Sequence, residues 1–247
     1  MEILGKKTEK KLPLKIGDNS FLGIGIPYIF TFTTYTQREL EELGNAIFGW
    51  WYHSEEDTLD KLDEELLSLQ ADLYFEYVYR LANGPIIPWD YEFFVKYVIQ
   101  EFNLIKQSFK QIPFKEKLEN IIRKVKIFQE NAKIINEQKD ELLVKNYEVT
   151  TDREKEKIKR LNRLILNLGR YLIPAFRSAT EKYSHDPYGY SILAKPLPRV
   201  YEVLEKIRSE DIDSVEYNGL INQLIRQYNI LEDTVSDVIS FTNSIQL

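Results

Sequence analysis

Over most of this chain, apolar residues recur every three or four positions, the spacing that places them on one face of an α-helix. The pattern begins near Leu59 and continues to the C-terminus, and proline or glycine interrupts it at 83–85, at Pro113 and at Pro174. Because such residues end helices, each interruption divides the pattern into separate helices. We therefore expect a mainly α-helical protein, arranged as a helical bundle.

The interruptions predict six helices. The first helix runs from near Leu59 to Gly84, the second from Pro88 to Pro113, and the third starts before Leu118. The fourth runs from near Asp152 to Pro174, the fifth from Pro198 to Arg208, and the sixth from near Ser214 to Ser244. An irregular stretch at 178–198, rich in Tyr, Gly and Pro, separates the fourth helix from the fifth. Irregular loops of this length are uncommon in compact domains and are often functional.

The first 60 residues have a different pattern. Lys11–Ile16 alternates in polarity, and Tyr28–Tyr35 (YIFTFTTY) is β-branched and aromatic, so that both are strand candidates. Two strands are not stable by themselves, so this piece is predicted to be the edge of a larger sheet that the chain does not contain. We expect a small α/β remnant at 1–84 and a helical domain at 85–247.

The net charge is −6, from 33 basic and 39 acidic residues. Nucleic acid and anionic membrane surfaces attract a positive excess, so neither is expected as the main partner. No apolar run approaches the about 20 residues that span a bilayer, and the N-terminus lacks the apolar core of a signal peptide. There is no cysteine to form a disulfide or a thiolate metal site. These features predict a soluble, cytoplasmic protein.

The chain has two histidines, His53 and His185, which limits metal and acid–base chemistry. His53 lies in GWWYHSEEDTLDKLD, and two interpretations of it stay open. Next to two tryptophans it suits a packed or capping residue. The carboxylates at 55–57 could instead orient its imidazole as a metal ligand through the second ring nitrogen. Ser54 followed by Asp57 also fits a helix start, which would explain the acids without a metal.

The segment WYHSEEDTLDKLD resembles the part of co-catalytic zinc peptidases that ends in their last metal ligand, a histidine after a tyrosine. Further segments resemble, in the same order, parts of the glutamate carboxypeptidase and transferrin receptor branch of that family. They are GDNSFLGIGIP at 17–27, LANGPIIPWDYEFF at 81–94, NRLILNLGRYLIPAF at 162–176 and LPRVYEVLEKI at 197–207. The resemblance covers nearly the whole chain.

The resemblance implies roles for three residues. His53 would be a zinc ligand, and Tyr52 would be a catalytic residue that donates to the developing oxyanion. Asn19 would lie near an asparagine that binds substrate in the family. The loop Tyr183–Lys195, which contains His185, would lie where the helical domain of the family reaches over the active site.

The sequence also lacks several residues that the family uses for catalysis and for substrate recognition. A bridged two-zinc site needs several histidine and carboxylate ligands and a glutamate general base, and all except His53 would precede residue 1. One imidazole does not make a catalytic zinc site, which takes about three protein ligands. Phe30 and Phe32 stand where members that prefer C-terminal glutamate carry arginines, so glutamate specificity is not expected.

Two main hypotheses about function follow. In the first, the chain is a non-catalytic dimerisation or interaction module that forms a homodimer through its helical domain and holds no cofactor by itself. The same apolar stripes would also suit the core of a monomer. In the second, the chain is the C-terminal half of a split dinuclear zinc peptidase, and an upstream peptidase chain supplies the missing ligands. A third possibility is a fragment of a longer protein.

Overall fold

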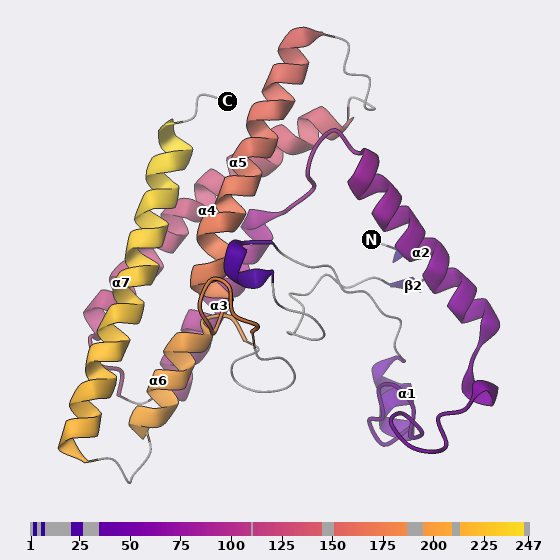
Figure 1. The fold of residues 1–247 in the computed structure, drawn as a ribbon, viewed down its shortest axis with the longest axis horizontal. Coiled ribbons are helices and arrows are strands. Elements are labelled where there is room, and N and C mark those ends of the chain that lie inside the picture. Colours follow the sequence, from indigo (N-terminus) through magenta and orange to yellow (C-terminus); the bar gives the residue numbers. More distant parts are fainter. Residues whose placement is uncertain are drawn as a thin grey trace. The chain divides into compact units, whose positions relative to one another are not determined.

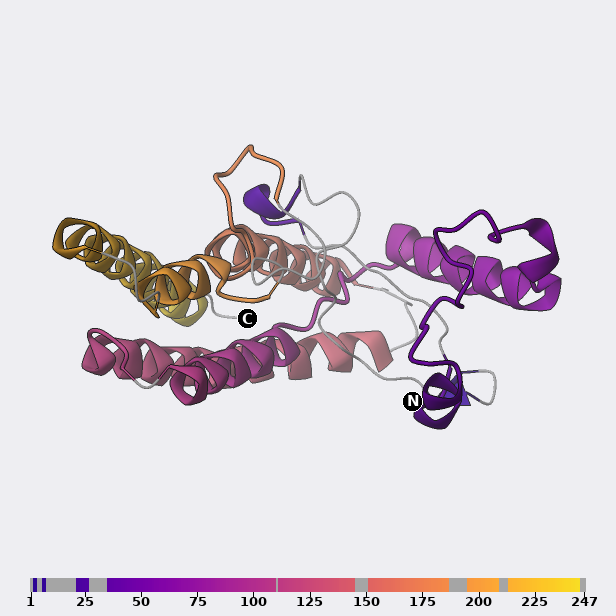
Figure 2. The same cartoon turned by 90° about the horizontal axis from the view of Figure 1, so that it is seen from below.

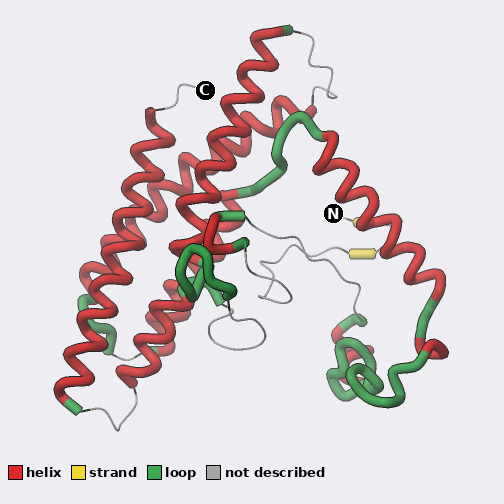
Figure 3. Tube along the Cα trace, viewed as in Figure 1, coloured by secondary structure: helices red, strands yellow, loops and turns green. Residues whose placement is uncertain are grey.

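The computed structural model describes residues 2–3, 6–7, 21–26, 35–109, 111–144, 151–186, 195–208 and 213–244. The protein is mainly helical, which confirms the predicted class (Figure 3). It divides into two compact units. One combines Met1–Tyr28 with Pro85–Leu247 and is called the helical unit below; the other is Ile29–Gly84, called the inserted unit. The expected domains 1–84 and 85–247 stay a prediction.

Among its described residues, the helical unit contains five long helices and three short N-terminal elements, a 3-10 helix and two strands (Figure 1). The helices are α3 (Tyr91–Ser108), α4 (Lys115–Val144), α5 (Asp152–Phe176), α6 (Pro198–Arg208) and α7 (Ser214–Ser244). The 3-10 helix η1 (Leu22–Ile24) lies against α5. Strands β1 (Glu2–Ile3) and β2 (Lys6–Lys7) form an antiparallel ladder in which Glu2 pairs with Lys7.

The five helices form two layers (Figure 2). The hairpin of α3 and α4 is one layer, and α5, α6 and α7 form the other. At about 1.5 Å per residue, α7 is long enough to run back along both α6 and α5, and it also packs on α4. The helix α7 therefore contacts helices of both layers.

The core of the helical unit consists of the apolar stripes that the sequence predicts. From α3 and α4 it buries Phe94, Val98, Phe102, Ile105, Leu118, Ile121, Val125, Phe128, Ala132 and Ile135, and from α5 and α7 Leu161, Ile165, Leu168, Leu172, Leu224, Tyr228, Leu231, Val235 and Val238. Tyr217, at the start of the last stripe, is instead exposed. Ile245, at its end, lies outside the described residues.

Local capping chemistry explains where two of these helices begin. The Thr151 hydroxyl accepts from the Glu154 N–H, and the Glu154 carboxylate accepts in return from the Thr151 N–H. This capping box satisfies backbone donors that the first helical turn leaves unpaired. Asp90 caps α3 in a similar way by accepting from the Phe93 N–H. At its other end, α5 continues two residues beyond the predicted stop at Pro174.

The inserted unit has α1 (Gln37–Glu42), the 3-10 helix η2 (Leu59–Lys61) and α2 (Glu64–Asn83). The helix α1, which begins at a capping box between Thr36 and Glu39, was not predicted from the sequence. The helix start considered at Ser54 does not form. The chain makes turns there, and α2 begins only after Asp63, whose carboxylate accepts from the Leu66 N–H.

The predicted strand Lys11–Ile16 lies outside the described residues, as does all of Tyr28–Tyr35 except Tyr35. Within the described part of the chain, the ladder of β1 with β2 is the only sheet. The small α/β remnant therefore stays a prediction.

Candidate functional site

Tyr52 and His53, the predicted catalytic and metal-binding residues, lie in a series of turns between α1 and η2. The Tyr52 N–H donates to the Gly49 carbonyl oxygen at 3.3 Å, and the Ser54 N–H donates to the Trp51 carbonyl oxygen at 3.0 Å. The Ser54 hydroxyl donates to the same Trp51 oxygen at 2.6 Å. These local bonds hold the turn that presents both side chains.

Gly49 allows this turn to form. It has a φ of 89°, and a Cβ atom there would lie 2.5 Å from the Trp51 indole ring. A side chain at this position would therefore meet both a strained backbone and a steric clash. Gly49 is also the one buried residue in the described part of the inserted unit.

The two side chains stack on each other. The Tyr52 and His53 rings have a centroid distance of 3.9 Å and an interplanar angle of 21°, and both residues are exposed. His53 has a φ of 61°, a left-handed conformation that non-glycine residues seldom adopt and that is concentrated at functional sites. The turn thus holds an exposed imidazole beside a phenol.

The acidic residues at 55–57 are predicted as possible partners of the His53 imidazole. Among the described residues, no hydrogen bond joins the imidazole to the acids at 55–57. Further along, Asp60 contacts Lys61 and Thr58, and the hydrogen bond from Lys61 lowers the pKa of its carboxyl group. No group of three or more His, Asp or Glu side chains in the described ranges is arranged to hold a metal.

The inserted unit exposes many large apolar side chains among its described residues. Exposed large side chains in the inserted unit include Trp50 at 65%, Leu59 at 87% and Phe75 at 70%. The helix α2 has no buried residue, although Leu66, Leu67, Tyr74, Phe75, Val78, Tyr79 and Leu81 are on it. Helices that are apolar around most of their circumference are normally buried.

Asn19, the predicted substrate-binding residue, lies outside the described residues, and so do Tyr188 and Tyr190 of the loop that follows α5. The described part of that loop is closed by Asp186, which is 1% exposed. Its Oδ1 accepts from the N–H groups of Ala179 and Thr180 at 2.8 and 3.0 Å, and from the hydroxyl groups of Ser178 and Thr180. His185 is exposed next to this closure.

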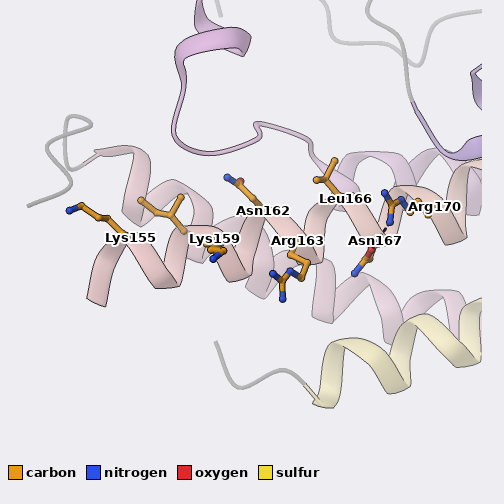
Figure 4. Close-up of a pocket in the computed structure, with 8 residues that line it drawn as sticks. Lys155, Lys159, Asn162, Arg163, Leu166, Asn167 and Arg170 are labelled. Carbon is orange, nitrogen blue, oxygen red and sulfur yellow. Dashed lines mark hydrogen bonds between the residues drawn. The ribbon is translucent and has the colours of Figure 1, made fainter. Parts of the chain in front are cut away.

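A shallow hollow of about 440 Å³ lies along one side of α5 (Figure 4). Among the described residues its lining comes from α5 alone, and it consists of Lys155, Ile158, Lys159, Asn162, Arg163, Leu166, Asn167 and Arg170. The lining is cationic, but a hollow with one wall does not enclose a small ligand.

Two polar clusters in the helical unit were not predicted from the sequence. Asn162 bonds to the backbone of the segment that leads into α3, and Glu232 of α7 accepts from three side chains of α4. Both join residues more than 70 positions apart in the sequence. The local patterns that reveal helices carry no signal for such pairs.

No protein-family model matches the sequence, and no functionally characterised protein matches it either. Membership of the glutamate carboxypeptidase branch therefore stays a prediction. None of the helices in the described part of the chain has both the length and the apolar character needed to cross a membrane.

Proposed function

We propose that this chain is a non-catalytic dimerisation and interaction module of a glutamate carboxypeptidase-like protein of the cytoplasm. In this proposal the helical unit is the scaffold. The inserted unit, together with the predicted strands, is the remnant of a peptidase-like α/β domain. A second polypeptide supplies the rest of that domain and covers the inserted unit.

The observation that carries the proposal is a difference in burial between the two units. The helical unit buries apolar side chains from all five of its long helices. In the described part of the inserted unit, no apolar side chain is buried. A folded segment is stabilised by about 25 cal/mol for each Å² of apolar surface that it removes from water. Apolar side chains that stay in water contribute none of this stabilisation. The inserted unit therefore has the surface of an interface or of half a core.

The homodimer is assigned to the helical unit because that unit has its own core and can present a preformed surface. Sedimentation equilibrium of the purified chain tests this assignment. A mass twice that of the 29.3 kDa chain at micromolar concentration supports it. A mass equal to one chain at every concentration would contradict the homodimer.

The second polypeptide is tested by copurification from the source cells. We expect a chain with the missing peptidase sheet and metal ligands to accompany this one. We also expect alanine at Phe75 and Val78, which are 70% and 64% exposed, to release it. As a matched control, alanine at Leu104, which is 44% exposed on α3 of the helical unit, should leave copurification unchanged.

A second candidate function is the C-terminal half of a split dinuclear zinc peptidase. The exposed Tyr52 and His53 favour it, because a pure scaffold does not need a phenol and an imidazole side by side at a surface. In this candidate His53 would add one ligand to a zinc site formed mainly by the partner chain. Tyr52 would be close enough to the metal-bound substrate to donate a hydrogen bond.

Metal analysis separates the two candidates. A split peptidase binds about two zinc ions per assembly, and His53→Ala lowers that content. A pure interaction module has the same metal content with either residue at 53. In both cases the isolated chain is expected to show no aminopeptidase or carboxypeptidase activity with added zinc, and turnover by the rigorously pure chain would refute both.

A further inference from the structure

Two segments of the helical unit flank the inserted unit, 21–26 before it and 85–90 after it; they are called the outgoing and the returning connection below, and both contact α5. Before the inserted unit, the last described residue of the helical unit is Ile26, directly after η1. After the inserted unit, Pro85–Asp90 leads into α3. All the contacts described next lie within the helical unit.

The returning connection is held by Asn162 of α5. The Asn162 Nδ2 donates to the Pro85 carbonyl oxygen at 2.7 Å, and the Ile87 N–H donates to the Asn162 Oδ1 at 2.9 Å. The Asn162 amide therefore both donates a hydrogen bond to the backbone of this segment and accepts one from it. The residue between these two bonds, Ile86, is 3% exposed. Farther along, Lys139 donates to the Trp89 carbonyl oxygen at 3.2 Å.

The outgoing connection is held by a contact between two glycines. Gly25, which ends η1, has a φ of 85°, and a Cβ atom there would lie 2.6 Å from the Gly169 carbonyl oxygen. A Cβ atom at Gly169 would lie 2.8 Å from the Gly25 carbonyl oxygen and 3.0 Å from the Tyr91 hydroxyl. The backbones of η1 and α5 approach this closely only because neither residue has a side chain. Leu22, one turn earlier, is buried.

The two anchors are neighbours on α5. Gly169 follows Asn162 by seven residues, which is two helical turns, so that both lie on the same face about 10 Å apart. Figure 4 shows Asn162 and Arg170, the residue after Gly169, along this helix. The short loop between α5 and Asp186 also contacts η1. A Cβ atom at Gly23 of η1 would overlap the Lys182 backbone of that loop.

We propose that Asn162 and Gly169 of α5 form a mount that fixes the two segments flanking the inserted unit, 21–26 and 85–90, to one helix of the helical unit. The Asn162 side-chain amide holds the returning connection through two hydrogen bonds, and the contact between Gly25 and Gly169 holds the outgoing connection. Fixing both ends of a segment lowers the conformational entropy that it loses when a partner orders it. The entropic benefit rests on the partner of the proposed function, whereas the contacts of the mount lie inside the helical unit, so its test can fail without the proposed function failing.

Amide hydrogen exchange of the full chain tests the mount. Asn162→Ala removes both bonds to the returning connection, and we expect exchange in 85–90 to accelerate about tenfold while peptides of α4 and α7 are unchanged. Asn167→Ala is the matched control, since its side chain is on the same helix and its hydrogen bond is a long one of 3.5 Å from Arg170. It should leave 85–90 as in the wild type.

Gly169→Ala tests the other anchor and should accelerate exchange in 21–26. Gly219→Ala on α7, where a Cβ atom would meet open space, is its control. If Gly169→Ala does not fold, Asn162→Ala decides alone. The proposal is overturned if 85–90 exchanges in Asn162→Ala as slowly as in Asn167→Ala, or if exchange rises equally throughout the helical unit.

Discussion

Glu232 connects α7 to α4 through three side chains. Its carboxylate accepts from Lys117 Nζ at 2.8 Å, Lys124 Nζ at 2.9 Å and Asn120 Nδ2 at 2.6 Å. The Glu232 side chain is 18% exposed, so water screens these bonds less than it screens the ion pairs within single helices. The cluster therefore contributes to the packing of the two layers.

We predict that Glu232→Gln lowers the free energy of unfolding by about 1 to 2 kcal/mol at pH 7, because hydrogen bonds to a charged group are lost. Urea unfolding followed by circular dichroism measures this difference. Glu202→Gln, which breaks an exposed pair with Lys206 within α6, should change the free energy by less than about 0.5 kcal/mol. Equal effects of the two substitutions would contradict the role given to Glu232.

The same residue predicts a pH dependence. Hydrogen bonds from Lys117 and then Lys124 lower the pKa of Glu232 from its ordinary 4.5 to about 2. The folded protein thus binds this proton less readily than the unfolded chain does, so the stabilisation is complete above pH 4.5 and is lost as the pH falls towards 2. The difference between wild type and Glu232→Gln should shrink over this interval, and a constant difference would count against the cluster.

His53 gives a contrasting prediction at the residue scale. Its exposed ring stacks on Tyr52 and fills no core, so His53→Ala should leave the melting temperature nearly unchanged. Differential scanning fluorimetry of the isolated chain measures this. Tyr91→Phe, which removes a buried hydroxyl that donates to the Ile165 carbonyl oxygen at 2.7 Å, should cost about 1 kcal/mol and shows that the assay detects a lost contact. A loss of similar size in His53→Ala would identify His53 as a packing residue.

At the scale of single helices, α4 and α2 differ in how far their large apolar side chains are exposed to solvent. Phe128 of α4 is 1% exposed, whereas Phe75 of α2 is 70% exposed. We predict that Phe128→Ala costs about 3 to 5 kcal/mol of unfolding free energy, and that Phe75→Ala costs less than about 0.5 kcal/mol. Chemical denaturation of the purified chain compares them directly. A large cost for Phe75→Ala in the absence of a partner would show that α2 is packed within this chain.

The helices of the helical unit could be predicted because periodicity, caps and breakers agree there. The stripe from Leu118 to Ile135 and the Thr151 cap are local features of the sequence. The inserted unit was harder. The helix α1 is too short to show a period, although Thr36 and Glu39 carry a capping signature, and Ser54 carried a false one because its hydroxyl bonds back to Trp51.

The candidate site could be predicted only in part, for a physical reason. Tyr52 and His53 are adjacent in the sequence, so their pairing needed no tertiary information. What surrounds them depends on contacts between distant residues, as the mount also does. Asn162 meets Pro85 across 77 positions, and no local pattern in either segment indicates that contact.

At the scale of the whole molecule, the chain combines a helical unit that has a core with an inserted unit whose described residues bury no apolar side chain. The first can be stable by itself, because it buries apolar surface from both of its layers. The second is expected to gain its stability from another polypeptide. This asymmetry is the basis of the interaction module and of the split peptidase alike.

Native-state hydrogen exchange of the purified 247-residue chain tests this asymmetry most directly, by comparing the amides of α2 with those of α4. The account predicts that α4 exchanges only through global unfolding, whereas α2 exchanges about a hundredfold faster or more and slows when the partner chain is added. Equal protection of α2 and α4 in the purified chain without the partner would contradict this expectation.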